Sequence, residues 1–443
     1  MFTFEKNKFV LSLAILALAT LSVWYPALIF ITIGAIILVI FALRSPTVGI
    51  TTALLAATFG EFGRIEFGEI SFLILDLVAP IVLAIWFFRK LADKEKIPLD
   101  WLSGSLFAFW AVGILSLLFG FTELSTAEFK FALLHFLRFV GISGMLLVAR
   151  DLGKKEAHLV LNVTILSGVI LALAGFALLH LLPDFTEAGL TELGWDPHIG
   201  RLTSTFLDPN FAGGVFAFLL AILGGRFLQE RKLNRQILFS GLAGILGIAL
   251  FLTFSRSALL AVGIAGLVLG IFGDRRIFIG ILVLGILGVT TSGRLQERLG
   301  EFTKSVGSIS DESQQVLDDT AQLRVDSWRE SWQIFAEKPI LGIGFGAYKF
   351  HQNFSGEDSH AANGSDASLL NVAATTGILG LGVFGIFLWN LALISWRKKE
   401  WGFLAALAGL LVHSIFVNSL FFAPIALLLF TIGGTAATKS PQK

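Results

Sequence analysis

The chain contains no cysteine among its 443 residues. It therefore forms no disulfide, offers no thiol nucleophile and has no thiolate to ligate a metal. Charged residues are scarce as well, at 15% against about 25% in a soluble domain, which leaves too little polar surface to cover a water-soluble globule. The 33 basic and 32 acidic residues nearly cancel to a net charge of +1, so there is no basic field to hold nucleic acid.

Apolar residues, in contrast, make up 55% of the chain, and the mean hydropathy is +0.81. The 46 glycines and 43 phenylalanines suit helices that pack closely in lipid. A spanning helix needs about 20 mostly apolar residues, and about fourteen such runs follow one another. We therefore predict an all-α polytopic membrane protein with 12–14 transmembrane helices, although the break between the ninth and tenth runs could instead be a re-entrant turn. The predicted spans are 9–25, 27–43, 46–60, 70–88, 99–120, 131–149, 158–182, 205–224, 236–254, 257–272, 277–291, 367–395, 402–420 and 423–438.

The positions of lysine and arginine predict the orientation of these spans. If the N-terminus is cytoplasmic, the basic clusters all fall in inner segments, and the short outer loops hold only Arg64, Lys130, Arg201 and Arg256. We expect the first run to remain as a span, because another follows Pro26 at once with no cleavage site between them. The prediction is a multi-pass protein of the inner or plasma membrane with both termini in the cytoplasm.

One long polar segment interrupts the spans and defines three predicted regions. Residues 1–291 form a first transmembrane bundle, 292–366 an extracytoplasmic loop, and 367–443 a second bundle with a short tail. Apolar residues recur near helical spacing within the loop, which predicts amphipathic helices, the last of which ends at Lys338–Pro339. The following LGIGFGAYKF predicts a glycine-rich turn against the membrane surface. A long structured loop is more often functional than decorative.

Asp76, His135 and Arg138 are ionisable residues within predicted spans, where charge is costly. Asp76 lies about two turns into the fourth span, where it is either functional or an acceptor for a neighbouring hydroxyl or backbone amide. His135 and Arg138 share one face near the outer end of the sixth span. They either snorkel to the interface or form a structural pair, or else they line an outer-leaflet cavity.

Outer arginines suggest an anion site. Asp208 before Pro209 predicts a helix N-cap, whose free backbone N–H groups favour an anion, and Arg201 lies just upstream. Arg256 stands between two serines at the outer junction of two spans, where it either binds phosphate or reaches to the interface as a helix-end residue. Arg324 is a third outer arginine, on the predicted loop helix.

Four segments in order resemble the O-antigen ligase and O-antigen polymerase family: RLTSTFLDPNFAGG, FLTFSRSALLA, RVDSWRESWQIFAEKPILGIGFGAY and SDASLLNVAATTGILGLG. Together they span roughly residues 200–385. The resemblance implies a GT-C-like membrane glycosyltransferase of the cell envelope. Such an enzyme moves or polymerises a glycan from a polyprenyl diphosphate, such as undecaprenyl diphosphate, onto the hydroxyl of a glycan or lipid acceptor at the outer leaflet.

The resemblance also implies residue roles and the absence of a cofactor or catalytic metal. Arg201 and Arg256 would bind the donor diphosphate, with Arg324 and Arg138 as further candidates. Members usually carry a His–Asn pair about eleven residues before the glycine of GILG, whose histidine is the favoured base; here that count reaches Asp366. Either Asp366 or His360 is then the general base, although Asp366 could also cap the next helix.

This departure from the pattern favours a polymerase or another lipid-linked glycan transferase over a ligase to lipid A core. With one base and direct displacement, we expect inversion at the anomeric carbon. Trp328, Trp332 and Tyr348 of the loop could stack on acceptor sugars or simply pack.

Two other functions fit parts of the sequence. A transporter or lipid-linked glycan flippase would explain the many spans and the intramembrane polar residues, but it would often show internal repeats and midplane sites, which this sequence lacks. A non-catalytic scaffold of envelope assembly would explain the loop and leave the outer arginines without a role.

Overall fold

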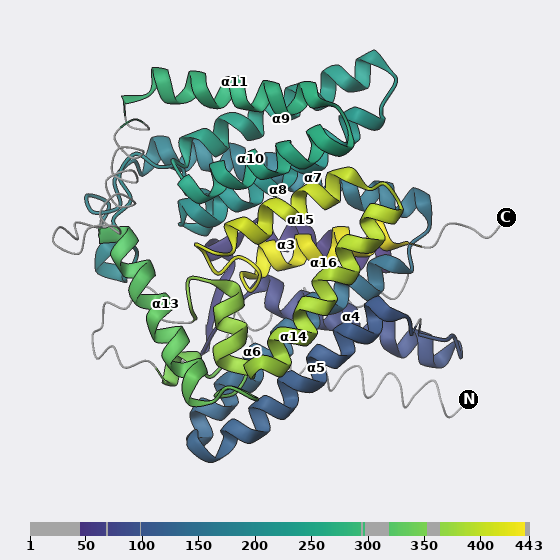
Figure 1. Ribbon diagram of the computed structural model, residues 1–443, viewed down its shortest axis with the longest axis vertical. Coiled ribbons are helices and arrows are strands. Elements are labelled where there is room, and N and C mark those ends of the chain that lie inside the picture. Colours follow the sequence, from purple (N-terminus) through teal and green to yellow (C-terminus); the bar gives the residue numbers. More distant parts are fainter. Residues whose placement is uncertain are drawn as a thin grey trace, which may run out of the picture.

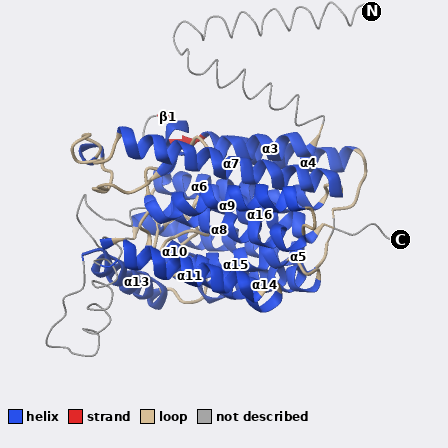
Figure 2. Cartoon of the chain, turned by 90° about the horizontal axis from the view of Figure 1, so that it is seen from above, coloured by secondary structure: helices blue, strands red, loops and turns tan. Residues whose placement is uncertain are grey.

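The computed structural model describes residues 45–67, 70–97, 99–293, 296, 319–351 and 364–438. This part of the chain is mostly helical, and its long helices lie side by side in one bundle (Figure 1). One helix, α13 (Asp319–Glu337), instead crosses the ends of the others, as Figures 1 and 2 show from two directions.

The helices before this crossing helix are α3 (Pro46–Ala57), α4 (Ile74–Ala92), α5 (Trp101–Gly120), α6 (Thr126–Arg150), α7 (Lys154–Leu181), α8 (Pro209–Gln229), α9 (Leu233–Leu252), α10 (Arg256–Phe272) and α11 (Arg275–Thr291). After it come α14 (Ser368–Arg397), α15 (Trp401–His413) and α16 (Ala423–Ala437). The short elements are the strands β1 (Arg64–Phe67) and β2 (Ile70–Leu73) and the 3-10 turns η1 (Gly60–Gly63), η2 (Phe121–Glu123), η3 (Thr191–Leu193), η4 (Ser204–Phe206) and η5 (Tyr348–Phe350).

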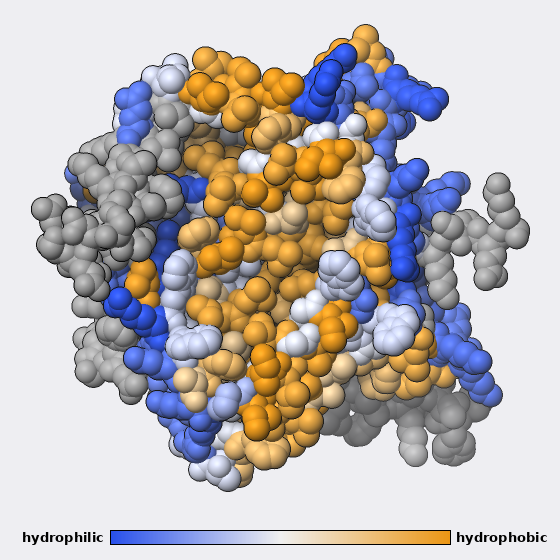
Figure 3. Space-filling model, viewed as in Figure 1, coloured by the Kyte–Doolittle hydropathy of each residue, from blue (hydrophilic) through white to orange (hydrophobic). Residues whose placement is uncertain are grey.

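Six helices of the described residues are long and apolar enough to cross a membrane, namely α5 with η2, α6, α7, α8, α9 and α14. Four shorter apolar helices, α3, α10, α15 and α16, lie among them. The surface agrees, since a hydrophobic band lies between polar margins on two opposite sides, and α13 belongs to one of these margins (Figure 3). The prediction of a helical membrane protein is confirmed. The first two predicted spans lie outside the described residues, so the number of about fourteen remains a prediction.

The predicted span 70–88 begins differently from expectation. Residues 64–67 and 70–73 form an antiparallel pair, with Arg64 opposite Leu73, because apolar side chains alternate there with polar ones at the period of a strand. The helix α4 starts only at Ile74, so Asp76 lies in its first turn rather than two turns inside. Its Oδ2 accepts a hydrogen bond from the backbone N–H of Leu73 at 3.0 Å, the structural role weighed from the sequence.

The helix α8 lies at the centre of the bundle, packed by α9, α10 and α15. It begins at Pro209 as predicted, because Asp208 Oδ1 accepts hydrogen bonds from the backbone N–H groups of Asn210 and Phe211 at 2.6 and 3.0 Å. A central helix with a capped start holds the residues around Asp208 in a fixed position at one end of the bundle.

The outer loop is anchored where α14 breaks. Gly377 interrupts the helix with φ 65° and ψ −168°, which frees backbone groups on either side. The glycine-rich turn supplies partners for them, since the N–H groups of Ile343 and Gly344 donate to Ala374 O and Thr375 O, both at 3.1 Å. In return, Ile378 N donates to Pro339 O at 2.8 Å. The predicted turn is therefore inserted into the bundle, where it fixes the preceding α13.

Candidate functional site

The first two motifs of the sequence meet at the start of α8. Arg201 Nε donates to the carbonyl of Thr253 at 2.9 Å, and its Nη2 donates to Asn210 Oδ1 at 3.4 Å. The same amide oxygen accepts from Ser255 Oγ at 2.9 Å. Asn210 thus joins Arg201 to the serine–arginine–serine motif, two segments about fifty residues apart in the chain.

Arg256 is the first residue of α10 and follows Ser255, which adopts the extended conformation of an N-cap. The hydroxyls of Ser255 and Ser257 lie 3.2 Å apart. Because Ser255 is bonded to Asn210, the backbone of Arg256 is held beside the segment that carries Arg201. Arg201 and Arg256 are each partly exposed residues at this end of the bundle.

The third predicted arginine reaches the same end of the bundle from α13. Arg324 lies close enough to His413, the last residue of α15, for their charges to interact. The imidazole of His413 is fully buried, with Nδ1 2.5 Å from Ser419 Oγ. It packs against α8, where a methyl group on Gly214 would lie 2.9 Å from its Cε1. His413 therefore lies near Arg324 and also packs against the helix whose first turn contains Asn210.

The candidate base Asp366 is held against the same face of the molecule. Its backbone N–H donates to Ser327 Oγ on α13 at 3.1 Å, one turn after Arg324. Its carboxylate lies near the phenol of Tyr348, whose hydroxyl is 2.7 Å from Ser331 Oγ. Burial, followed by the nearby charges of Glu330 and Asp366, raises the pKa of Tyr348 to about 12. The other candidate base, His360, lies outside the described residues.

The three loop aromatics occupy different environments. Tyr348 is only 1% exposed, which supports the packing alternative for this residue. Trp332 is 59% exposed, so it is accessible to a ligand, and its ring lies 5.4 Å from that of Phe335. Trp328 lines an apolar pocket beside the first turn of α14. A role in stacking on sugars stays a prediction for all three residues.

Arg138 is engaged in the bundle. Its Nε lies 2.8 Å from Asp76 Oδ1, which forms an ion pair between α6 and α4. His135 Nδ1 is 3.1 Å from the carbonyl of Phe131. The ion pair supports a structural role for Arg138, whereas this contact of His135 is with the backbone of its own helix. A role of Arg138 in diphosphate binding stays a prediction.

One group of side chains has the donor types of a metal site. Asp196, His198 and Asp208 each bring a ligand atom within 4.8 Å of the others. Carboxylate and imidazole suit a divalent cation. Because Asp208 also caps α8, a cation there would lie next to the arginine-bearing segment. These three residues are therefore the place to test the predicted metal independence.

Two residues of this region were not assigned roles from the sequence. In the sequence Asn210 is only one residue of its motif, because an amide that joins distant segments is visible only in the fold. His413 did leave a signal, because an ionisable residue inside a predicted span usually has a specific role.

The comparisons with known proteins agree with the motifs. A search of curated proteins found no match to this chain. The family described as O-antigen ligase matches residues 241–385, a third of the chain. The matched segment contains Arg256, Arg324, Asp366 and the glycine-rich turn, while Arg201 lies upstream and is joined to it through Asn210. Residues 241–385 are therefore similar to the O-antigen ligase family, in agreement with the motifs of the sequence.

Proposed function

We propose that this protein is a metal-independent glycosyltransferase that takes a glycan from a polyprenyl diphosphate. It moves or polymerises that glycan onto an acceptor hydroxyl at the outer leaflet. The observation that carries the proposal is the junction at Asn210, which holds Arg201 beside the serine–arginine–serine motif at the capped start of α8. Arg324 lies near His413, which packs against the same helix.

The chemistry follows from these charges. The acceptor oxygen attacks the anomeric carbon, the bond from that carbon to the phosphate oxygen breaks, and the diphosphate leaves with the electron pair. Guanidinium groups fixed beside the leaving group stabilise the charge that develops on it. Arginine suits this role because its planar fork donates two hydrogen bonds to a phosphate.

The acceptor proton needs a base. Asp366 is the described candidate, since Ser327 holds its backbone against α13 at the face that carries Arg324. His360 is the alternative base. A single base and a direct attack predict a product with inverted configuration.

The proposed location is the inner or plasma membrane, with the site on the extracytoplasmic side. The polar margin with α13 supports this side, because the long loop is the segment predicted to lie outside. Lys398 Nζ donates to Thr438 O at 2.5 Å. Because Lys398 follows the end of α14 that lies away from α13, Thr438, the last described residue, lies at that end too. This arrangement supports a cytoplasmic C-terminus, and the positions of lysine and arginine support a cytoplasmic N-terminus.

A transfer assay tests the proposal. Purified protein in detergent is incubated with a polyprenyl-diphosphate oligosaccharide and an acceptor, and the products are separated on a gel. We expect a longer or transferred glycan that is lost in Arg256→Ala. Loss in Asp366→Ala would identify the base as Asp366, while retained activity would point to His360. No product from a range of donors, with movement of the same lipid across vesicles without ATP, would instead establish a transporter.

A further inference from the structure

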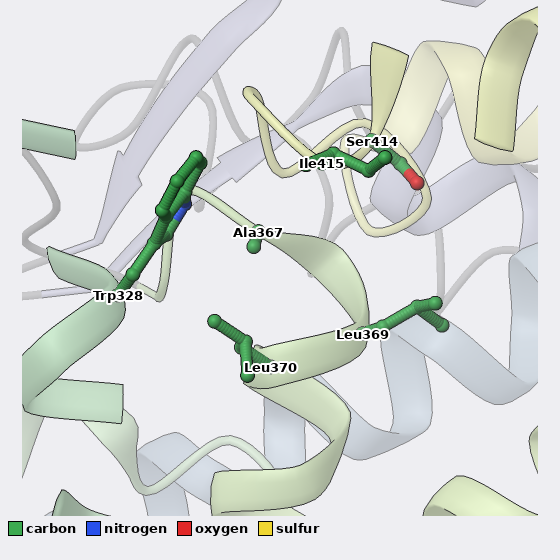
Figure 4. A pocket seen from close by; sticks show the side chains of 6 residues that line it. All are labelled: Trp328, Ala367, Leu369, Leu370, Ser414 and Ile415. Atoms are coloured by element: carbon green, nitrogen blue, oxygen red, sulfur yellow. The ribbon is translucent and has the colours of Figure 1, made fainter. Parts of the chain in front are cut away.

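An apolar pocket opens beside the candidate site, between α13, the start of α14 and the segment after α15 (Figure 4). Its volume is about 210 Å³. The lining residues are Trp328, Ala367, Leu369, Leu370, Ser414 and Ile415. Two of them reach the outer surface, since Leu369 is 38% and Ile415 46% exposed. The pocket is therefore accessible from the surface of the bundle.

The lining favours an apolar occupant over a sugar. Of its side chains, only those of Trp328 and Ser414 carry polar atoms, and Ser414 Oγ already donates to Leu411 O at 2.7 Å. Trp328 Nε1 is buried and makes no hydrogen bond within the described part of the chain. A sugar ring would bury several hydroxyls here with a single free donor to meet them, which is costly. A hydrocarbon segment with one oxygen at its end fits both the apolar wall and the indole N–H.

The polar neighbours of the pocket indicate which hydrocarbon it is. Trp328 lies one helical turn after Arg324 on α13, so the two residues share a face. Ala367 follows Asp366, and Ser414 follows His413. Three lining residues are thus next to residues of the candidate site, and an amphipathic ligand with an anionic head at Arg324 would place its adjoining apolar part in this pocket.

We propose that this pocket binds the isoprene units of the polyprenyl donor that adjoin the diphosphate. The inference rests on the proposed function and adds the part of the donor that these residues recognise. The indole N–H of Trp328 then donates to the oxygen that joins the first isoprene unit to phosphate. The donor rather than the acceptor is the occupant, because the neighbouring cation, Arg324, is a predicted ligand of the diphosphate.

A substitution at the rim tests the pocket with little risk to folding. Ile415→Trp places a large ring over the opening at a position that is already 46% exposed. Ile386→Trp is the matched control, since Ile386 is 54% exposed on α14 and does not line the pocket. Lipid tails are as apolar as the pocket, so binding gains packing rather than hydrophobic energy. We therefore expect a moderate loss of donor affinity, about tenfold.

The direct measurement is photocrosslinking of a polyprenyl diphosphate that carries a photoreactive group in its first isoprene unit and no sugar. We expect the crosslink to map to α13 or the first turn of α14, to weaken about tenfold in Ile415→Trp and to persist in Ile386→Trp. Unlabelled polyprenyl diphosphate should compete, whereas phosphatidylglycerol at the same concentration should not. Equal competition by both lipids, or equal labelling of the two variants, would overturn the inference.

The outcome is separable from that of the proposed function, because the probe carries no glycan and no reaction takes place. Labelling that meets these expectations in a protein without transferase activity would support the pocket and refute the transferase. Glycan transfer with the crosslink mapped to another part of the bundle would refute the pocket alone. In the transfer assay, Ile415→Trp should raise KM for the donor and leave kcat close to that of the wild type.

Discussion

The substitution Gly377→Ala tests whether the break in α14 holds the outer loop in place. At this residue φ is 65° and ψ is −168°, a region of backbone conformation that is essentially restricted to glycine. A methyl group there would lie 2.2 Å from the carbonyl carbon and oxygen of Ile340. Alanine would therefore have to change its backbone conformation and also displace the turn that is docked on it.

The expected cost has two parts. An unfavourable backbone conformation costs about 1–3 kcal/mol for a residue with a side chain. Forcing an extra carbon into a packed position costs about 1–3 kcal/mol more. A total of about 4 kcal/mol changes the equilibrium between the docked and undocked turn by about a thousandfold.

Hydrogen exchange measures this change directly, because the N–H groups of Ile343 and Gly344 donate across the interface. We expect the peptide that contains them to exchange about a thousandfold faster in Gly377→Ala when exchange proceeds through undocking. Gly382→Ala on the same helix is the control, since no atom lies within 4 Å of its added methyl group, and its exchange should match the wild type. Equal protection of the turn in both variants would refute the argument.

Three further predictions concern the site. Asn210→Ala removes the acceptor shared by Arg201 and Ser255, so we expect kcat/KM to fall about 10- to 100-fold; Asn162→Ala, which removes the acceptor of Arg226, should leave it unchanged. Tyr348→Phe removes the bond to Ser331 and should lower stability by about 1 kcal/mol. Because burial raises the pKa of Tyr348 to about 12, its phenol stays neutral up to about pH 10, and the pH profile of the variant should match the wild type there. A chelator and Asp196→Asn should both leave the transfer rate unchanged; a loss restored by a divalent cation would show that the cluster at Asp208 is a catalytic metal site.

The sequence predicted those features of the fold that depend on local chemistry. The cap at Asp208 and the proline after it determine the start of α8, and both are visible as adjacent residues. The helical spacing of apolar residues in the loop predicted α13, and Lys338–Pro339 ends it as expected. Local signals of this kind need no knowledge of the rest of the chain.

Other features depend on contacts between distant segments and could not be predicted. The sequence around Gly377 is a continuous apolar run, and the break is stabilised by hydrogen bonds from residues 339–344, more than thirty positions earlier. The helix α15 ends at His413 although its run was predicted to continue to 420, because the following residues fold back and Ser419 contacts the imidazole.

The candidate site shows the same division. The motifs predicted which arginines would lie at one face of the bundle, because each of these arginines stands among motif residues that can be recognised in the sequence. The partner of Arg138 could not be predicted, because Asp76 belongs to another helix and only packing of α4 on α6 brings the two together. The environment of Trp328 was also hidden, since three segments build its pocket.

The most direct test of the account is the amount of polyprenyl diphosphate released for each glycosidic bond that forms. The purified protein is supplied with a lipid-linked oligosaccharide, and both products are quantified in one reaction beside Arg256→Ala. The account predicts equal amounts of the two products in the wild type and the loss of both in the variant. Release of polyprenyl diphosphate by Arg256→Ala at the wild-type level would contradict the account. Movement of the glycan lipid across the membrane with its sugar–diphosphate bond intact would contradict it as well.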